Sequence, residues 1–359
     1  MHLALVLILF TAIVSAQDDV LAEKSRRAKQ ATLAGDYTTA VKLYRELVAA
    51  LPANPGLRLN LGLTLEKSGQ PAAAIPELER VTKAEPNFAP AWFLLGLAYQ
   101  QLGQPKKAIV PLRKSVGFDD TNLDAHFELA DAALASGESQ EAAKQFQIVA
   151  DRRPELAKAW QGLGLAYVAL GDLKRAEQCF ERVAALPDSP EIHELLAESD
   201  QRLGRRVDAV EEWRKAVALA PNDSRLQGRL AESLMRDRKY EEAERILQPL
   251  VAAHPENGEW QYLMGNVLFE QRRADAALSH LVGAERLLPG HLPTFEVLGR
   301  VYLALDQPDK AVRYLEKARA LDDGSISFAL STAYRRLGRE AEAKAALARY
   351  RELSLGDKR

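Results

Sequence analysis

The chain has 359 residues, with 48 lysines and arginines against 50 aspartates and glutamates, for a formal net charge of −2. No block of basic residues stands out, so binding of nucleic acid or anionic membranes through bulk charge is disfavoured. The length would suffice for two domains, but an internal repeat runs through the chain and overrides that expectation.

The first predicted element is a signal peptide over residues 1–16. An apolar run from Leu3 to Val14 is followed by small residues that suit cleavage before Gln17. The run is too short to cross a bilayer as a stable helix, and no Lys or Arg precedes it. We therefore expect an exported protein, periplasmic or extracellular, with no integral membrane span after cleavage. An uncleaved anchor and a misassigned start are the alternatives.

From residue 21 onward, two kinds of position recur along the chain. The first, a small residue, is found at Ala28, Gly62, Gly96, Ala130, Gly164, Ala197, Ala231, Gly265, Gly299 and Ser331. The second, an alanine, is found at Ala40, Ala74, Ala108, Ala142, Ala176, Ala209, Ala243, Ala277, Ala311 and Ala343. Neighbours in both series are 34 residues apart, except for steps of 33 into the sixth copy and 32 into the tenth. Because both series show the same intervals between neighbouring copies, chance does not account for the repeat.

The fifth copy shows what one unit of the repeat contains. Trp160, Leu163 and Tyr167 lie at helical spacing on one face of a first helix. Gly171 ends this helix, because glycine takes left-handed backbone angles at little cost. A second apolar face follows, and Pro187, which has no N–H to donate, stops the second helix. Each copy is therefore predicted to be a pair of antiparallel helices.

A close crossing of the two helices explains why both recurring positions are small. A bulky residue of the second helix is expected to fill the space around the crossing in each copy. This bulky position is occupied by Tyr44, Leu78, Leu112, Phe146, Phe180, Trp213, Leu247, Leu281, Leu315 and Leu347.

The pattern W-x2-LG-x2-Y…A-x3-F…P of the fifth copy resembles the tetratricopeptide repeat, whose period is about 34 residues. The resemblance covers about ten copies, near residues 21–54, 55–88, 89–122, 123–156, 157–189, 190–223, 224–257, 258–291, 292–323 and 324–355. It implies an all-α fold, a right-handed superhelical α-solenoid of antiparallel helix pairs forming a single domain over residues 17–355. Residues 356–359 are expected to fray. Arg238, Arg272 and Asp306 replace the turn glycine in three copies, which leaves the turn geometry open there.

The resemblance also implies where a partner would bind. In the family, one face of the first helices lines a concave groove that takes ligands. Here that face is set by the residues three before, one after and four after the small position. The candidate groove residues are Leu59, Leu63, Phe93, Leu97, Phe127, Leu165, Val168, Tyr262, Asn266, Phe269 and Arg300.

The character of this face changes along the chain. Copies two to five carry an apolar stripe, which also includes Leu134, whereas copies six and seven carry Glu191, Glu194, Glu198, Arg225 and Glu232. An exposed apolar stripe of that extent usually marks a partner site. The alternative is that adjacent helices cover much of it.

No catalytic or metal-binding pattern is present in the sequence. The six histidines do not form H-E-x-x-H, and there is no G-x-S-x-G, phosphate loop or P-C-x-x-C. Cys179 is the only cysteine, so an internal disulfide is impossible, and we interpret it as a partly buried apolar residue rather than a reactive thiol. We expect no cofactor, no metal and no enzymatic activity.

Two functions remain open from the sequence. The first is a non-catalytic scaffold outside the cytoplasm that binds a peptide or amphipathic helix of a protein partner in its groove. The second is an accessory subunit of an envelope polysaccharide or secretion machine, or of an exported enzyme complex. The oligomeric state is not decided by the sequence.

Overall fold

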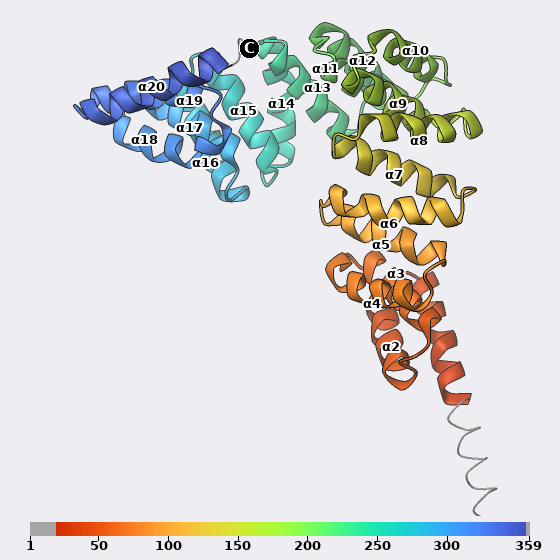
Figure 1. Cartoon of the computed structure of the whole chain (residues 1–359). Coiled ribbons are helices and arrows are strands. Elements are labelled where there is room, and N and C mark those ends of the chain that lie inside the picture. Colours follow the sequence, from red (N-terminus) through yellow and green to blue (C-terminus); the bar gives the residue numbers. More distant parts are fainter. Residues whose placement is uncertain (1–18, 357–359) are drawn as a thin grey trace, which may run out of the picture. The chain divides into compact units, whose positions relative to one another are not determined.

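The computed structural model describes residues 19–356 (Figure 1). All regular structure in this range is helical, which confirms the predicted all-α fold. The predicted signal peptide, residues 1–16, lies outside the described residues. So does the predicted frayed tail, apart from Gly356, the last residue of α20.

The chain divides into two compact units, Met1–Leu186 and Pro187–Arg359. In the first, residues 19–33 are helical and precede α2 (Tyr37–Ala50), α3 (Pro55–Lys67), α4 (Pro71–Ala84), α5 (Ala89–Gln101), α6 (Pro105–Phe118), α7 (Leu123–Ala135), α8 (Ser139–Arg152), α9 (Ala157–Ala169) and α10 (Leu173–Ala184). The second contains α11 (Pro190–Arg202), α12 (Arg206–Leu219), α13 (Ser224–Arg236), α14 (Tyr240–Ala253), α15 (Gly258–Glu270), α16 (Ala274–Leu287), α17 (Leu292–Ala304), α18 (Pro308–Lys317), the 3₁₀ turn η1 (Arg319–Leu321), α19 (Ser325–Arg336) and α20 (Glu340–Gly356).

The helices of each unit form an inner and an outer layer. Each first helix packs on its own second helix, and that second helix packs on the first helix of the next pair, as Figure 1 shows for α5 to α8. Neighbouring first helices also contact one another, α3, α5, α7 and α9 in one unit and α13, α15, α17 and α19 in the other. Within residues 19–356, neighbouring second helices make no comparable contact. The first helices therefore form the inner layer of each unit.

The small position of each copy is small because the two helices of a pair touch there. A Cβ built on Gly96 would lie 2.4 Å from Cγ of Leu112, and one on Gly164 would lie 2.5 Å from Cε1 of Phe180. Real Cβ contacts are longer than this. The bulky position thus packs directly onto the small one, as the sequence predicted.

An asparagine directly precedes several first helices and caps them. The Oδ1 atoms of Asn54, Asn122 and Asn257 each accept a hydrogen bond at 3.1 Å from a backbone N–H in the first turn of α3, α7 and α15. A side-chain acceptor satisfies an N–H that has no partner within the helix, so these residues set where the helices start.

In copies two to five, seven and eight, a side chain four positions before the small residue ties the pair to the turn that precedes it. It contacts the carbonyl oxygen six residues earlier in Arg58 to Pro52 (3.1 Å), Trp92 to Pro86 (2.7 Å), His126 to Asp120 (3.1 Å), Trp160 to Pro154 (3.0 Å), Gln227 to Pro221 (2.7 Å) and Gln261 to Pro255 (3.1 Å). The residue types differ, but all carry a side-chain nitrogen. In these copies the position therefore holds a group that can form a hydrogen bond with a carbonyl of the preceding turn.

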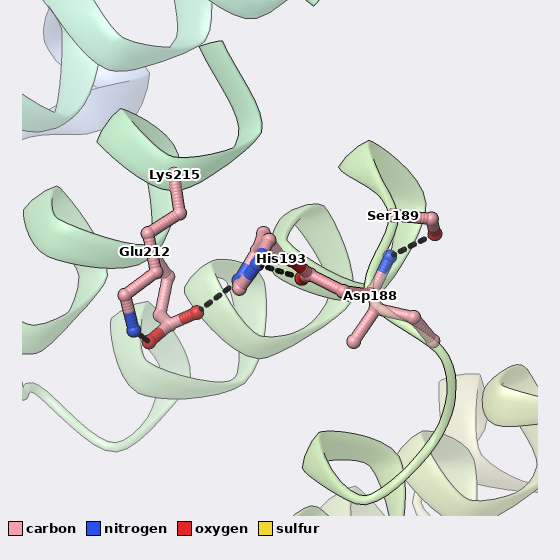
Figure 2. A network of polar contacts seen from close by, with 6 residues as sticks. Asp188, Ser189, His193, Glu212 and Lys215 are labelled. Atoms are coloured by element: carbon pink, nitrogen blue, oxygen red, sulfur yellow. Dashed lines mark hydrogen bonds and ion pairs between the residues drawn. The ribbon is translucent and has the colours of Figure 1, made fainter. Parts of the chain in front are cut away.

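The sixth copy keeps this contact with a different acceptor. The repeat step into this copy is one residue shorter, α10 ends earlier than the other second helices of its unit, and His193 Nε2 lies 2.6 Å from the Asp188 carboxylate instead of a backbone carbonyl. On its other side, Nδ1 lies 2.6 Å from Oε2 of Glu212, whose Oε1 accepts from Lys215 at 2.7 Å (Figure 2). This network is the structural equivalent of the tryptophan and glutamine contacts in other copies.

The three copies without a turn glycine keep the same turn conformation. Arg238, Arg272 and Asp306 have φ of 60°, 64° and 56°, in the left-handed region that Gly137 adopts at 83°. A residue with a Cβ is strained there.

This strain predicts opposite effects for two exchanges. Arg272→Gly is expected to raise the free energy of unfolding of the second unit by up to about 1 kcal/mol. Gly137→Ala, where no atom lies within 4 Å of the added Cβ, should lower that of the first unit by about 1 kcal/mol. Urea titrations followed by far-ultraviolet circular dichroism measure both, and shifts of the same sign would contradict the prediction.

Candidate functional site

The predicted groove residues of the first unit lie on its inner layer. Leu59 and Leu63 are on α3, Phe93 and Leu97 on α5, Phe127 on α7, and Leu165 and Val168 on α9, and all seven are half-buried. The Phe127 ring contacts Phe146 of α8 edge-on, with centroids 5.5 Å apart. The fold therefore covers one side of this apolar stripe and leaves the other side accessible.

Polar side chains lie on the same layer and link three of its helices. Gln100 Nε2 of α5 donates to the Glu128 backbone oxygen at 3.2 Å and to Asp131 Oδ2 at 3.4 Å, both on α7. Gln101 Nε2 donates to Glu66 Oε1 of α3 at 2.9 Å. We call Glu66, Gln100, Glu128 and Asp131 the acceptor cluster.

Of the three carboxylates in the acceptor cluster, Glu66 and Glu128 are half-buried and Asp131 is exposed. Burial raises the pKa of the Glu66, Glu128 and Asp131 carboxyl groups above their ordinary values. For Glu128, repulsion from Asp131 and Glu66 adds to the effect of burial, which places the three charges within electrostatic reach of one another. No ion pair within residues 19–356 involves any of the three.

The cluster also holds acceptors without donors. Oε2 of Glu66 and Oε1 of Gln100 are both inaccessible to solvent and lack a hydrogen-bond partner in the structure. Buried polar atoms are rarely left in this state, because each one costs about 1–3 kcal/mol of desolvation. Both side chains form other hydrogen bonds, since Glu66 Oε1 accepts from Gln101 and Gln100 Nε2 donates to α7.

Most of the acceptor cluster lies on the first-helix face that the repeat spacing defines, but it is not among the predicted groove residues. Glu66 and Gln100 stand four residues after Gly62 and Gly96, and Asp131 stands one after Ala130. The predicted groove residues of the first unit are all apolar, whereas these are polar or charged. Within residues 19–356 none of the three carboxylates forms an ion pair, although attraction to Lys67 partly offsets the effect of burial on the pKa of Glu66.

In the second unit, the predicted groove residues pair with one another. Arg300 lies over the Phe269 ring, 4.9 Å from its centroid, and its Nη2 donates to Glu270 at 3.2 Å. Asn266 Nδ2 donates to the Tyr262 hydroxyl at 3.5 Å, and all four predicted residues are half-buried. The structure brings these residues together, and the polar groups of Arg300, Asn266 and Tyr262 already have hydrogen-bond partners within the unit.

The charged residues of copies six and seven are also largely matched. Glu194 forms an ion pair with Arg225, and Glu232 pairs with Arg229 at 3.2 Å and Arg236 at 2.7 Å. Such pairs on a solvated face contribute little to stability.

The single cysteine is inert at neutral pH. Burial raises the pKa of the Cys179 thiol to about 11, so it is protonated under ordinary conditions. In the part of the chain that the structure describes, no group of three or more His, Cys, Asp or Glu is placed to hold a metal ion. None of the described helices is both long enough and apolar enough to cross a membrane.

Stacked antiparallel helix pairs with an accessible inner layer define an α-solenoid of the kind that binds other proteins. Two sequence profiles of the tetratricopeptide repeat match the chain, one at residues 31–97, 65–114 and 202–267 and the other at residues 127–190 and 297–357. A profile for subunit 3 of the anaphase-promoting complex, cyclosome, matches residues 236–318. The chain belongs to the tetratricopeptide repeat family.

The known proteins similar to the chain differ widely in the share of their own length that it covers. Human tetratricopeptide repeat protein 13 is 33% identical over 141 residues, which are 37% of this chain and 16% of that protein. The type IV pilus assembly protein PilF of Pseudomonas aeruginosa is 26% identical over 222 residues, 59% of this chain and 86% of PilF. A chain of the APC/C hetero-tetramer Cut9-Hcn1 superposes with a TM-score of 0.53 at 14% identity, over 91% of this chain and 92% of its own length, which shows the shared fold.

Proposed function

We propose that the chain is a non-catalytic scaffold of ten tetratricopeptide repeats that binds a peptide or amphipathic helix of a protein partner along the inner layer of its first unit. The half-buried apolar stripe carries this proposal. It runs over α3, α5, α7 and α9, and most of its residues pack on the core with one side while all of them stay partly exposed. An accessible apolar surface of this kind is typical of a helix-binding groove.

We further propose that the protein acts outside the cytoplasm, on the strength of the signal-like residues 1–16. A second candidate function, an accessory subunit of an envelope assembly or secretion machine, is favoured by the similarity to PilF, whose name describes type IV pilus assembly. Pull-down from the envelope fraction separates the two: a co-purifying synthase or hydrolase supports the accessory subunit.

The scaffold function predicts that two aromatic residues of the stripe are needed for partner binding. The double variant Phe93→Ala/Phe127→Ala is expected to lower the yield of partner cross-linked in cells at least about tenfold, because two of the largest apolar contacts are lost. The matched control is Val110→Ala/Leu173→Ala, which removes apolar residues that are 57% and 59% exposed on the outer layer. The control should cross-link as the wild type does.

Folding must be checked separately, since Phe127 also packs on Phe146. Far-ultraviolet circular dichroism and the thermal transition decide whether the double variant is folded, and Phe93→Ala alone replaces it if it is not. Equal cross-linking by a folded variant and the wild type would rule out the stripe as the binding site.

A further inference from the structure

We propose that the sixth copy, formed by α11 and α12, is a pH-sensitive element that is closed in acid and loosens as the pH rises to neutral, because two aspartates stand where other copies have an attractive pair. By closed we mean that the two helices are packed against each other. The inference concerns the second unit and goes beyond the proposed function, which rests on the first.

In three other copies, a cation on the second helix covers a tyrosine on the first. The tyrosine stands three residues after the small position, and the cation stands eight residues after the tyrosine. The distance from the cationic group to the ring centroid is 6.0 Å for Lys107 and Tyr99, 4.4 Å for Arg175 and Tyr167, and 5.2 Å for Lys310 and Tyr302. A cation near a ring face is attracted to it, so the pair helps to hold the two helices of a copy together.

The sixth copy carries aspartates at both of these positions, Asp200 on α11 and Asp208 on α12. The first position belongs to the core in copies two, seven and eight, where it holds the buried leucines Leu65, Leu234 and Leu268. The Asp200 side chain is likewise only 17% exposed. A carboxylate therefore occupies a core position, and a second negative charge stands where other copies place a cation.

Charged groups of both signs surround Asp200, but the cations are not bound to it closely. On α12, Asp208 and Glu212 repel its negative charge, whereas Lys215 attracts it. Lys215 also donates to Glu212 at 2.7 Å, so its charge is shared (Figure 2). In the turn between the helices, Arg205 Nη1 lies 4.0 Å from Asp200 Oδ1, the outer limit of an ion pair.

These surroundings make the Asp200 carboxyl group titrate closer to neutral pH than an exposed aspartate does. Burial above all, together with repulsion from Asp208 and Glu212, raises its pKa to about 6. In an unfolded chain an aspartate has a pKa of about 4. Because the closed copy binds the proton more tightly than the open one, the closed form is most stable below about pH 4 and loses stability as the pH rises through about 6.

The rest of the copy offers little to oppose this loss. The Nε1 atom of Trp213, at the bulky position of α12, is buried and lacks a hydrogen-bond acceptor. Within residues 19–356, the contact that joins α13 to α15 has no comparable counterpart between α11 and α13. Local opening concentrates in poorly supported elements, so we expect α11 and α12 to separate while the remaining helices of the unit stay folded.

The test is hydrogen–deuterium exchange of the full chain at about pH 4 and about pH 7.5, read by mass spectrometry on peptides from α11 and α12. Asp200→Asn replaces the carboxylate by a neutral group of the same shape. It is compared with the wild type at the same pH, so that the intrinsic pH dependence of exchange and any effect of His193 cancel. Asp208→Asn removes the repelling charge and leaves Asp200 in place. The matched control Asp275→Asn removes an exposed charge from the second helix of the eighth copy.

We expect Asp200→Asn to slow exchange in α11 and α12 at least about tenfold at the higher pH and only about twofold at the lower one, where the wild-type carboxyl group is mostly protonated. Asp208→Asn should slow exchange about two- to fivefold at the higher pH only, and the control should change it at neither. Equal slowing at both pH values, or no slowing, would overturn the inference. If circular dichroism shows that Asp200→Asn has lost helix content, Asp208→Asn decides by the same two criteria.

Discussion

Replacing Leu112 by alanine is expected to lower the free energy of unfolding of the first unit by about 2–5 kcal/mol. Leu112 is fully buried, and its side chain fills the space against Gly96 where α5 and α6 cross. Alanine leaves a cavity there, because the two helices are held at their separation by the pairs on either side. Urea titration followed by circular dichroism measures the loss.

The pairing of bulky and small positions makes this prediction sharper. Gly96→Ala alone should cost about 1–3 kcal/mol, since its Cβ would overlap the Leu112 side chain. In the double variant the alanine at 96 enters space that Leu112 has vacated, so the combined loss should be clearly smaller than the sum of the two. Additive losses would show that the two positions do not meet in solution.

A control on the same helix separates overlap from the general effect of replacing glycine. Gly117 also lies in α6, and no atom stands within 4 Å of a Cβ built on it. Gly117→Ala should therefore stabilise the unit slightly, by up to about 1 kcal/mol, because alanine is the better helix former.

The fold was predictable from the sequence because it depends on short-range spacing. A small residue every 34 positions, and a bulky one at a fixed distance after it, define where two helices cross. Gly96 and Leu112 meet in the structure as that spacing requires. The repeat also continues through the copies that lack the turn glycine, since Arg238 and Arg272 have positive φ as the turn glycines do.

The candidate site was predictable only in part, because its properties depend on side chains from different repeats. The face of the first helices follows from helical geometry, and the seven apolar residues of the first unit do lie on the inner layer. Their half-burial depends on contacts such as that of Phe127 with Phe146. The charge of the acceptor cluster depends on which carboxylates lack cations, and helix spacing carries no information on that.

The residue four positions before the small one illustrates a pattern visible only after the structure is known. Its occupants in copies two to eight are Arg58, Trp92, His126, Trp160, His193, Gln227 and Gln261, which share no size, charge or hydropathy. The structure shows that each places a side-chain nitrogen at an acceptor of the preceding turn. Tryptophan is therefore one of several residue types that can make this contact with the preceding turn.

Arginine at this position supplies the second large expected effect. Arg58→Met should lower the free energy of unfolding of the first unit by about 2–3 kcal/mol, below the cost of breaking a fully buried pair because some solvent reaches it. Nη1 of Arg58 pairs with Glu77 at 2.5 Å, Nε and Nη2 donate to the Pro52 carbonyl at 3.1 and 2.9 Å, and both side chains are only 16% exposed. Methionine keeps the apolar stem and removes every donor.

Two further variants divide this loss between the ion pair and the turn carbonyl. Arg58→Gln should retain a donor to Pro52, as Gln227 does to Pro221 at 2.7 Å, and should lose about 1 kcal/mol less than Arg58→Met. Arg26→Met breaks an ion pair with Glu23 whose side chains are 72% and 55% exposed, so its effect should stay within about 0.5 kcal/mol. Equal losses for Arg58→Met and Arg26→Met in urea titrations would show that burial does not strengthen the pair. Equal losses for Arg58→Met and Arg58→Gln would show that the turn carbonyl contributes nothing, and the recurrence of nitrogen-bearing side chains at this position would then need another cause.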